Sequence, residues 1–314
     1  MPRRPLDEQH EAVLVDEALG ALAVEPGGYY VDATFGRGGH TARILEAVGR
    51  EGRVLALDRD PQAIAAGRAR FADDVRLALI HAPFSQLAGL VPAHAQGRAC
   101  RGVLFDLGVS SPQLDDPARG FSFRADGPLD MRMDPTRGEP VSAWLARASV
   151  DEIREVIATL SEERFARRVA EAIGAARRVR PLERTAELAA LVARAVRTRE
   201  PGKHPATRTF QALRMHVNDE LGELTRGLSA AVEVLAVGGR LAAITFHSIE
   251  DRVVKQFLKR ASSVPPELAA LPVLPPQVQP RLRLVGRKLR PSAAEQARNP
   301  RSRSALLRVA EKLA

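Results

Sequence analysis

The amino-acid sequence predicts an α/β protein whose parallel sheet is interrupted by a block of helices. Three observations support this fold class: short apolar runs alternate with helical patterns over residues 29–109, the alternation resumes near Gly239, and residues 136–215 carry helical periodicity only. Strands that alternate with helices are typical of βαβ units in a parallel sheet. We therefore expect a discontinuous core, residues 1–135 with 216–314, and an inserted helical subdomain at 136–215.

Length and composition indicate a globular protein of a reducing compartment. The chain has 314 residues, of which 45% are hydrophobic and 27% charged, as in ordinary folded domains. No apolar run approaches the ~20 residues of a membrane-spanning helix, and the N-terminus lacks the apolar segment of a signal peptide. A lone cysteine, Cys100, excludes an internal disulfide and a cysteine-based metal site. We expect a cytoplasmic protein without a metal centre.

The first predicted βαβ unit carries the clearest binding signal. A strand runs into Asp32, and a loop with three glycines in four residues, 36–39, precedes a helix at 41–48. The next strand, 53–58, ends in Asp58. Glycines let a ligand approach the backbone closely, and a carboxylate at the second strand end can accept hydrogen bonds from ribose hydroxyls. The unit therefore predicts a site for a nucleoside-containing cofactor.

Two residues favour S-adenosylmethionine over a dinucleotide. The fingerprint G-x-G-x-x-G would need glycine at position 41, where this chain has Thr41. Asp32 places a negative charge just before the turn, which repels a pyrophosphate but suits a cationic sulfonium and ammonium. An ordinary βαβ turn, with glycines that serve packing alone, is the simpler alternative. It does not explain why both acids flank the loop at this spacing.

The remaining strands are predicted from short apolar or alternating runs. They are expected at residues 75–80, 102–109, 239–246, 281–285 and 304–309, the last two closing one edge of the sheet. The carboxyl ends of parallel strands share one edge of an open α/β sheet, and ligands bind there. Asp32, Asp58, Phe84 and Asp106 fall at such ends. Phe84 fits two interpretations equally well, a ring against a purine or a core aromatic.

Helical periodicity accounts for most of the other segments. Between the fourth strand and the insertion, residues 110–133 have no clear period but mix Phe, Met and Arg, which predicts a functional loop. Inside the insertion, Ser149 and Glu152 have the spacing of a capping box, and Thr185 is a candidate N-cap. Further helices are expected at 7–24, 61–71, 217–228 and 253–258, with a proline-rich connector at 264–280.

Positive charge is concentrated near the C-terminus. The net charge is +9 and the sequence pI is about 10.6. Between Arg281 and Arg308, nine Arg or Lys residues stand against one acid, Glu295. Such a patch favours a polyanionic partner, nucleic acid before membrane, while a solvated basic face is the plainer interpretation. The candidate RNA contacts are Arg298, Arg301 and Arg303.

Eight short blocks of sequence, in order, resemble the bacterial small-subunit ribosomal RNA cytosine-N4 methyltransferase family. The most specific blocks are Ser110-Ser111-Pro112-Gln113 and Leu129-Asp130-Met131-Arg132-Met133. The eight blocks lie at residues 32–40, 58–61, 106–113, 119–123, 129–133, 204–214, 246–252 and 299–304. They span almost the whole chain, and the resemblance implies a class I methyltransferase fold with a Rossmann-like sheet.

The same resemblance implies an enzyme that methylates the exocyclic N4 of a cytosine in the decoding region of 16S ribosomal RNA. Its methyl donor would be S-adenosylmethionine, and its substrate the RNA of an assembled or nearly assembled small subunit. The helical insertion is expected to recognise that substrate. The residues that the match places around the cofactor are Gly38, Gly39, His40, Asp58, Phe84, Asp106 and Gln113, with Asp58 on the ribose.

Methylation at N4 needs a hydrogen-bond acceptor, because the nitrogen lone pair is conjugated into the ring. The enzyme must hold N4 about 3 Å from the methyl carbon and accept its N–H, so that the lone pair localises. Asp106 is the candidate acceptor by position, with the backbone after it as the alternative. His247, after the fifth strand, could accept a proton or be a hydrogen-bonded structural histidine. Two other functions stay open: an RNA-binding assembly factor without turnover, and a nucleotide-dependent oxidoreductase.

Overall fold

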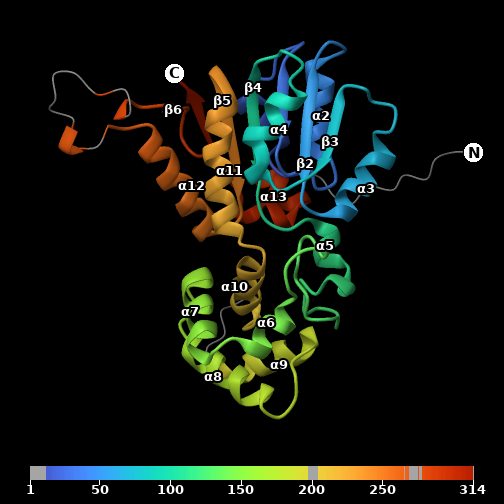
Figure 1. Ribbon diagram of the computed structural model, residues 1–314, viewed down its shortest axis with the longest axis vertical. Helices are drawn as coiled ribbons and strands as arrows, with labels where there is room; N and C mark the ends of the chain where they lie inside the picture. Colours follow the sequence, from blue (N-terminus) through green and yellow to red (C-terminus); the bar gives the residue numbers. More distant parts are fainter. Residues whose placement is uncertain (1–11, 197–203, 265, 269–274, 276–277, 314) are drawn as a thin grey trace, which may run out of the picture. The chain divides into compact units, whose positions relative to one another are not determined.

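The computed structural model consists of two compact units. The first comprises residues 1–108 with 221–314 and contains the sheet, and the second comprises residues 109–220 and is helical (Figure 1). The second unit starts before the predicted boundary at 136, because Phe121, Leu129 and other apolar side chains of the preceding segment are buried in its core. The residues that the structure describes are 12–196, 204–264, 266–268, 275 and 278–313.

Within the described residues, the first unit carries a seven-stranded sheet in the order β3-β2-β1-β4-β5-β7-β6. Strands β1 to β5 run parallel to one another, whereas β7 is antiparallel to both β5 and β6. This is the strand arrangement of class I methyltransferases, so the predicted fold class is confirmed, with the two C-terminal strands at one edge. The strands are β1 (Tyr29–Asp32), β2 (Arg53–Asp58), β3 (Leu77–His81), β4 (Cys100–Asp106), β5 (Leu235–Thr245), β6 (Leu282–Leu284) and β7 (Leu306–Lys312).

Helices cover both faces of this sheet. Side chains alternate along each strand, so Leu55 and Leu57 of β2 pack in one layer and Val54 and Ala56 in the other. Strands buried on both faces need near-continuous apolar runs, which is why these segments were predictable. The first layer holds α4 (Leu87–His94), α11 (Glu220–Val234) and α12 (Ser248–Ala261), and the second holds α1 (Val15–Leu22), α2 (Gly39–Val48) and α3 (Pro61–Arg70).

The second unit is built from helices around a core of its own. Buried Trp144, Ile153, Ile173 and Leu188 belong to this core. Its helices are α5 (Ser111–Asp115), α6 (Val141–Arg147), α7 (Val150–Ser161), α8 (Ala166–Arg177), α9 (Thr185–Ala195) and α10 (Thr207–Val217). None of the helices in the described parts of the chain is both long enough and apolar enough to cross a membrane.

Two predicted helix caps have different outcomes. The capping box at α7 is confirmed: the Ser149 hydroxyl accepts from the Glu152 N–H at 3.1 Å, and the Glu152 carboxylate accepts from the Ser149 N–H at 2.6 Å. The predicted N-cap at Thr185 is wrong, because Arg184 occupies that position. The buried Thr185 hydroxyl instead accepts from the Gly127 N–H at 3.0 Å and ties α9 to the preceding irregular segment.

The predicted loop at 110–133 is largely irregular but tightly held. Buried Arg119 donates to the carbonyls of Arg132 and Met133 at 3.1 and 2.9 Å. Asn218 accepts from the Met133 N–H and donates to the Met131 carbonyl, both at 2.7 Å. These bonds satisfy backbone groups that neither helix nor strand would pair. The predicted connector at 264–280 and the start of the predicted helix at 7–24 lie mostly outside the described residues.

Candidate active site

Three acids meet at the carboxyl edge of the sheet in the first unit. Asp32, Asp58 and Asp106 are the last residues of β1, β2 and β4, which are parallel neighbours. In register, Asp58 stands beside His81 of β3, and Asp106 beside Ile244 of β5. The strand topology therefore brings the predicted acids to one edge, where open α/β sheets bind their ligands.

The glycine loop between β1 and α2 needs glycine for two reasons. Gly36 and Gly38 have φ angles of +55° and +73°, in the left-handed region that side chains disfavour. A Cβ at Gly38 would also lie 2.7 Å from the ring of Phe35, and a Cβ at Gly39 would lie 2.8 Å from the Cβ of Ala12. The loop is thus bare of side chains where a cofactor would approach, and closely packed behind.

Asp58 is held in place by two backbone N–H groups. Its Oδ2 accepts from Gly36 at 2.7 Å and its Oδ1 accepts from Asp60 at 2.8 Å. Burial raises the pKa of Asp58 to about 6, and these two hydrogen bonds oppose that rise. Each carboxylate oxygen keeps a second lone pair, so both oxygens can accept from ribose hydroxyls without losing their supports.

Asp32 is fully buried and ties β1 to α2. Its Oδ2 accepts from the Thr41 hydroxyl at 2.6 Å, and its Oδ1 accepts from the Thr34 N–H at 3.2 Å. Burial raises the pKa of Asp32, opposed by the charge of His40 and by these bonds. Thr41, which breaks the dinucleotide fingerprint, is therefore the hydrogen-bond donor of a buried acid. With no exposed surface, Asp32 acts on a ligand through its charge rather than by contact.

Asp106 presents an acceptor atom with no hydrogen-bond partner among the described residues. Its backbone N–H donates to the Thr34 hydroxyl at 2.6 Å, which fixes the end of β4. Its Oδ2 lies 3.7 Å from His40 Nδ1, while its buried Oδ1 makes no hydrogen bond there. Burial raises the pKa of Asp106 to about 6; the His40 charge opposes the rise and the charges of Asp32 and Glu250 add to it. An unpaired buried acceptor is costly unless a ligand donates to it.

The His40 side chain is turned away from open space. It is 4% exposed, and its Nε2 lies 3.1 Å from the Val13 carbonyl. The resemblance expects His40 on the cofactor, and in this arrangement its backbone, in the first turn of α2, is the part left for such contact.

Phe84 packs as part of the core of the first unit. It begins a 3₁₀ turn after β3, and its ring meets the ring of Phe105 edge-on at a centroid distance of 5.3 Å. A Cβ at Gly227 of α11 would lie 2.4 Å from the same ring. Of the two interpretations left open by the sequence, the core aromatic is the one with observed contacts. A purine contact by the exposed part of the ring stays a prediction.

His247 caps a helix. It is the N-cap of α12, where its Nδ1 accepts from the Glu250 N–H at 3.4 Å. Its Nε2 lies 2.9 Å from Glu250 Oε1, and Glu250 Oε2 accepts from the Phe246 N–H at 3.1 Å. Because both ring nitrogens face buried Glu250, the geometry favours the structural histidine over the proton acceptor.

Gln113 belongs to the second unit and has a local role there. Its side chain accepts from the Ser110 N–H at 3.0 Å, which completes a capping box at the start of α5. Gln113 is buried. A contact of this residue with the cofactor stays a prediction.

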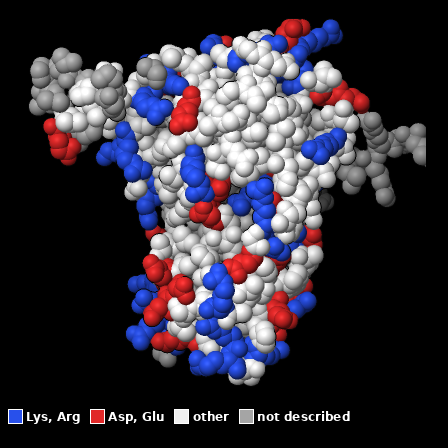
Figure 2. All heavy atoms as spheres, viewed as in Figure 1, with Lys and Arg blue, Asp and Glu red and all other residues white. Residues whose placement is uncertain are grey.

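The three candidate RNA-binding arginines lie at the carboxyl edge of the sheet. Arg298 ends α13 (Ala293–Arg298), and exposed Arg301 and Arg303 lie in the next turn. That turn leads into Leu306, the first residue of β7, which pairs with Thr245 at the carboxyl end of β5. Figure 2 shows other basic side chains along α12 in the first unit and over α8 and α9 in the second.

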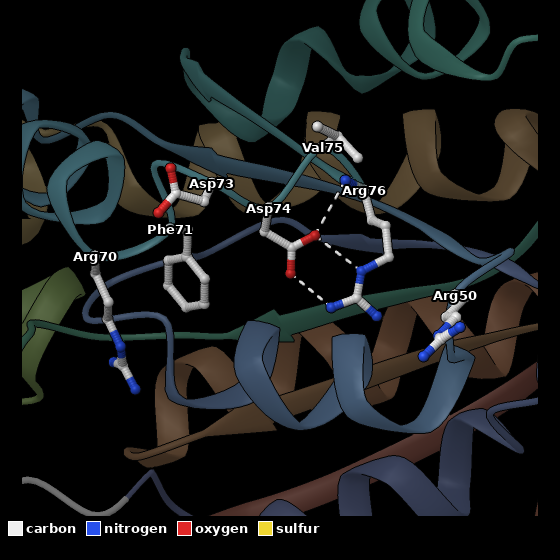
Figure 3. Close-up of a pocket in the computed structure, with 7 residues that line it drawn as sticks. All are labelled: Arg50, Arg70, Phe71, Asp73, Asp74, Val75 and Arg76. Atoms are coloured by element: carbon white, nitrogen blue, oxygen red, sulfur yellow. Dashed lines mark hydrogen bonds and ion pairs between the residues drawn. The ribbon is translucent and has the colours of Figure 1, made fainter.

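A separate open recess of about 550 Å³ lies at the opposite edge of the sheet (Figure 3). Its lining residues precede β3 or follow α2, so they sit at the amino ends of the strands. The Arg76 guanidinium there bonds Asp74 at 2.6 Å and caps α2 by donating to the carbonyls of Leu45 and Gly49. The cation therefore completes a helix terminus, and the recess is not the cofactor site.

No three His, Cys, Asp or Glu residues gather as metal ligands in the part of the chain that the structure describes. The acids of the carboxyl edge are instead paired with hydroxyl and N–H donors, as above.

Comparison with known proteins identifies the family. The chain matches the model of the MraW methylase family over residues 7–313. It belongs to that family. It is 58% identical over 309 residues to the ribosomal RNA small subunit methyltransferase H of Azoarcus sp. (strain BH72), covering 97% of both chains. It is 55% identical over 305 residues to the protein of the same name from Dechloromonas aromatica (strain RCB), covering 97% of this chain and 98% of that relative.

Among solved structures, this MraW methylase is similar to an rRNA methylase from Streptococcus thermophilus. The TM-score is 0.41 at 14% sequence identity, with 100% of this chain and 99% of that chain covered.

Sequence reasoning missed two residues of this site. Thr34 fixes both Asp32 and Asp106 through its backbone N–H and its hydroxyl. Glu295 accepts from the Leu14 N–H at 2.8 Å, across 281 positions of sequence. The bond from the Thr34 N–H to Asp32 is local, since Asp side chains commonly accept from the backbone two residues on. The Thr34 hydroxyl reaches Asp106 across 72 positions, which a local pattern does not predict. No local pattern pointed to Glu295.

Proposed function

We propose that this MraW methylase transfers a methyl group from S-adenosylmethionine to the exocyclic N4 of a cytosine in the decoding region of 16S ribosomal RNA. The observation that carries the proposal is the partly exposed carboxylate of Asp106, at the same edge of the sheet as a glycine loop and the ribose-type acid Asp58. The choice of substrate is supported by relatives at 55–58% identity, which are named as methyltransferases of small-subunit ribosomal RNA.

The first unit can hold S-adenosylmethionine, which supplies a methyl group on a sulfonium. Asp58 would accept from the ribose, and the backbone of Gly38, Gly39 and His40 would lie against the rest of the molecule. The carboxylates of Asp32 and Asp106 give this edge a negative potential that favours a cationic ligand. The same carboxylates would repel the pyrophosphate of a dinucleotide cofactor, which argues against an oxidoreductase.

Asp106 has the geometry for the chemical step. As the N4–methyl bond forms and the methyl–sulfur bond breaks, N4 gains positive charge and its N–H becomes acidic. The Asp106 carboxylate, whose side chain is 23% exposed, would accept that N–H, localise the lone pair on N4 and take the proton when the bond has formed. An acceptor of raised pKa is suited to this task, because its pKa of about 6 lies close to neutral pH.

The second unit would present the nucleotide. Extruding a base from its stack costs a few kcal/mol. Only 4% of this chain is aromatic, so it offers few rings against which to hold the base, and other contacts must offset the cost. The chain enters this unit just after Asp106 and the carboxyl end of β4, and leaves it at α11, which leads to β5. We take the substrate to be the assembled or nearly assembled small subunit, and the reaction to take place in the bacterial cytoplasm.

Methyl transfer to isolated subunits tests the proposal directly. Small subunits from cells that lack this enzyme are incubated with the protein and tritiated S-adenosylmethionine, and the RNA is digested to nucleosides. We expect label in N4-methylcytidine. Label in a ring-carbon or ribose methyl would contradict the proposal, and tight subunit binding without any label would instead indicate an assembly factor. Calorimetric titrations with S-adenosylmethionine and with NADH distinguish a methyltransferase from an oxidoreductase by which cofactor binds.

A further inference from the structure

Both ring nitrogens of His40 lie near an oxygen atom within the first unit. Its Nε2 lies 3.1 Å from the Val13 carbonyl oxygen, and its Nδ1 lies 3.7 Å from Asp106 Oδ2. The ring is 4% exposed, so water cannot substitute freely for either contact. The mechanism above uses the Asp106 carboxylate and leaves this neighbour without a role.

The Val13 contact decides where the ring proton sits. A carbonyl oxygen only accepts, so Nε2 must carry the hydrogen. In a neutral ring, Nδ1 would then point a lone pair toward the Asp106 carboxylate, which repels it. A further proton, on Nδ1 or on Asp106, would remove this repulsion. With the proton on Nδ1, the imidazolium keeps Asp106 ionised and able to accept.

A distant residue holds the Val13 carbonyl in position. Leu14, the next residue, has φ 55° and ψ 38°, a left-handed conformation that a leucine adopts at a cost. Its buried N–H donates to Glu295 Oε1 at 2.8 Å, and Glu295 is only 7% exposed. The preceding Ala12 fills the space where a Cβ of Gly39 would be. The short segment 12–14 is thus fitted between the glycine loop and Glu295.

We infer that Glu295 is a positioning residue of the active site: through Leu14 and Val13 it keeps His40 Nε2 protonated, so that His40 and Asp106 share one further proton. The inference rests on the proposed methyl transfer, since Asp106 is the acceptor that the pair serves. The other charged groups that face Asp106 are the carboxylates of Asp32 and Glu250. Both are negative, and both favour retention of that proton.

Loss of the Glu295 carboxylate should release the ring. In Glu295→Ala the Leu14 N–H loses its acceptor, the left-handed turn relaxes and the Val13 carbonyl moves away. His40 can then place a neutral Nδ1–H toward Asp106, so the shared proton is no longer needed. We expect the ring of His40 to lose its charge at a lower pH than in the wild type, and kcat to fall by about 10-fold or more, because the acceptor is less well placed.

The test follows His40 by ¹⁵N NMR across pH, with His40→Gln used only to assign its signals. Glu295→Gln keeps an oxygen that can accept from Leu14, so it should restore the wild-type titration and kcat. Ser292→Ala is the matched control: it removes the hydroxyl that accepts from the Glu295 N–H at 3.1 Å and loosens the same helix without touching Leu14. We expect it to lower the melting temperature and leave the titration alone.

Several outcomes would overturn the inference. They are an unshifted titration in Glu295→Ala, an equal shift in Ser292→Ala, and a failure of Glu295→Gln to restore the wild type. If Glu295→Ala does not fold, the wild-type spectrum still decides, because a neutral ring protonated at Nδ1 contradicts the assignment. The NMR titration needs no methyl transfer. An inactive wild-type protein would therefore refute the proposed function while the titrations still judge the role of Glu295.

Discussion

At the scale of single residues, the site is a set of buried acids whose hydrogen bonds differ. Asp58 uses both oxygens on backbone N–H groups, Asp32 uses both on Thr34 and Thr41, and Asp106 leaves one oxygen unpaired. All three have raised pKa values, because burial outweighs those bonds. The same residue type is therefore a structural tie at Asp32, and we propose it as the ribose acceptor at Asp58 and as the reactive acceptor at Asp106.

Replacing Asp58 should weaken cofactor binding. In Asp58→Ala the ribose would lose one or two charge-assisted hydrogen bonds, each worth about 1.5–3 kcal/mol. Isothermal titration with S-adenosylmethionine measures the loss, and exposed Asp73 gives a matched control in Asp73→Ala. An Asp58→Ala protein that melts cooperatively and binds with an unchanged Kd would contradict the ribose assignment.

Replacing Asp106 should lower activity and raise stability. The folded protein binds the Asp106 proton more tightly than the unfolded chain, since its pKa rises from 3.8 to about 6. The stabilisation from that proton is complete below pH 3.8 and is lost as pH rises through about 6. At pH 8 the ionised group thus costs the free protein about 3 kcal/mol of unfolding free energy.

In Asp106→Asn that cost is absent. We expect its melting temperature to exceed that of the wild type at pH 8, with the difference vanishing near pH 3.5, while methyl transfer falls by about 10²- to 10⁴-fold. Asp73→Asn should change neither. Equal stability of wild type and Asp106→Asn across this pH range would show that the carboxylate is not desolvated as described.

A contact of the site can be predicted from the sequence when its two residues are close in sequence or lie at the ends of neighbouring strands. The acids at 32, 58 and 106 were predictable because each ends a strand, and strand ends of a parallel sheet converge. The donors Thr34 and Thr41 lie within ten positions of Asp32, close enough for a local argument. The Leu14–Glu295 contact was not predictable, because it requires the fold to bring α1 and α13 together.

At the scale of elements, helix and strand ends do most of the positioning. The Arg298–Arg303 segment owes its place to β7, which starts at Leu306 beside the end of β5. Strand β5 was predicted four residues too short at its start, since Leu235 belongs to it although Gly238 and Gly239 follow. Paired glycines suggest a turn in sequence, and the bulge between β4 and β5 absorbs them here.

Neutralising Arg298, Arg301 and Arg303 together should weaken RNA binding and flatten its salt dependence. Up to three phosphate contacts would be lost, and each contributes to the slope of log K against log salt. Affinity for S-adenosylmethionine should not change. The control replaces exposed Arg43, Arg50 and Arg68, which lie on or after the helices of the glycine-loop side. If the slope of log K against log salt is the same for the two triple variants, the C-terminal arginines act only through general charge and not as phosphate contacts.

The capping box of α7 should be worth about 1 kcal/mol. Ser149→Ala removes the hydroxyl that accepts from the Glu152 N–H, and the helix it starts carries core residues of the second unit. The free energy of unfolding, from urea titration, should fall by that amount. Ser229, in the middle of α11, bonds only the Thr225 carbonyl, so Ser229→Ala should be neutral. A similar loss in both variants would mean that the cap itself adds nothing.

At the scale of the whole molecule, the boundary between the two units determines where the chain can be cut to separate cofactor binding from methyl transfer. Residues 109–135 were expected in the core domain, because their sequence has no helical period. They belong to the second unit, since irregular backbone can be held by Arg119 and Asn218 as firmly as by a helix. A cut at 136 would expose Leu129 and Met131, which are buried in the second unit.

Replacing residues 109–220 with a Gly-Ser linker should abolish methyl transfer and cost cofactor binding no more than the predicted contact of Gln113. The first unit keeps the acids and glycine loop, while the proposed substrate-presenting unit is gone. A cooperative melt establishes that the remainder is folded, and calorimetry and the tritium assay then measure the two functions. A folded remainder that methylates subunits at the full rate would contradict the role of the second unit.

The bond between Leu14 and Glu295 also has a consequence for biosynthesis. Its two ends are 281 positions apart in the sequence. A ribosome adding about 5–20 residues per second releases the glycine loop and its acids well before that partner exists. The nascent chain therefore carries Asp58 and Asp106 for much of its synthesis without the proposed support for His40, and the site is completed only after Glu295 has been added.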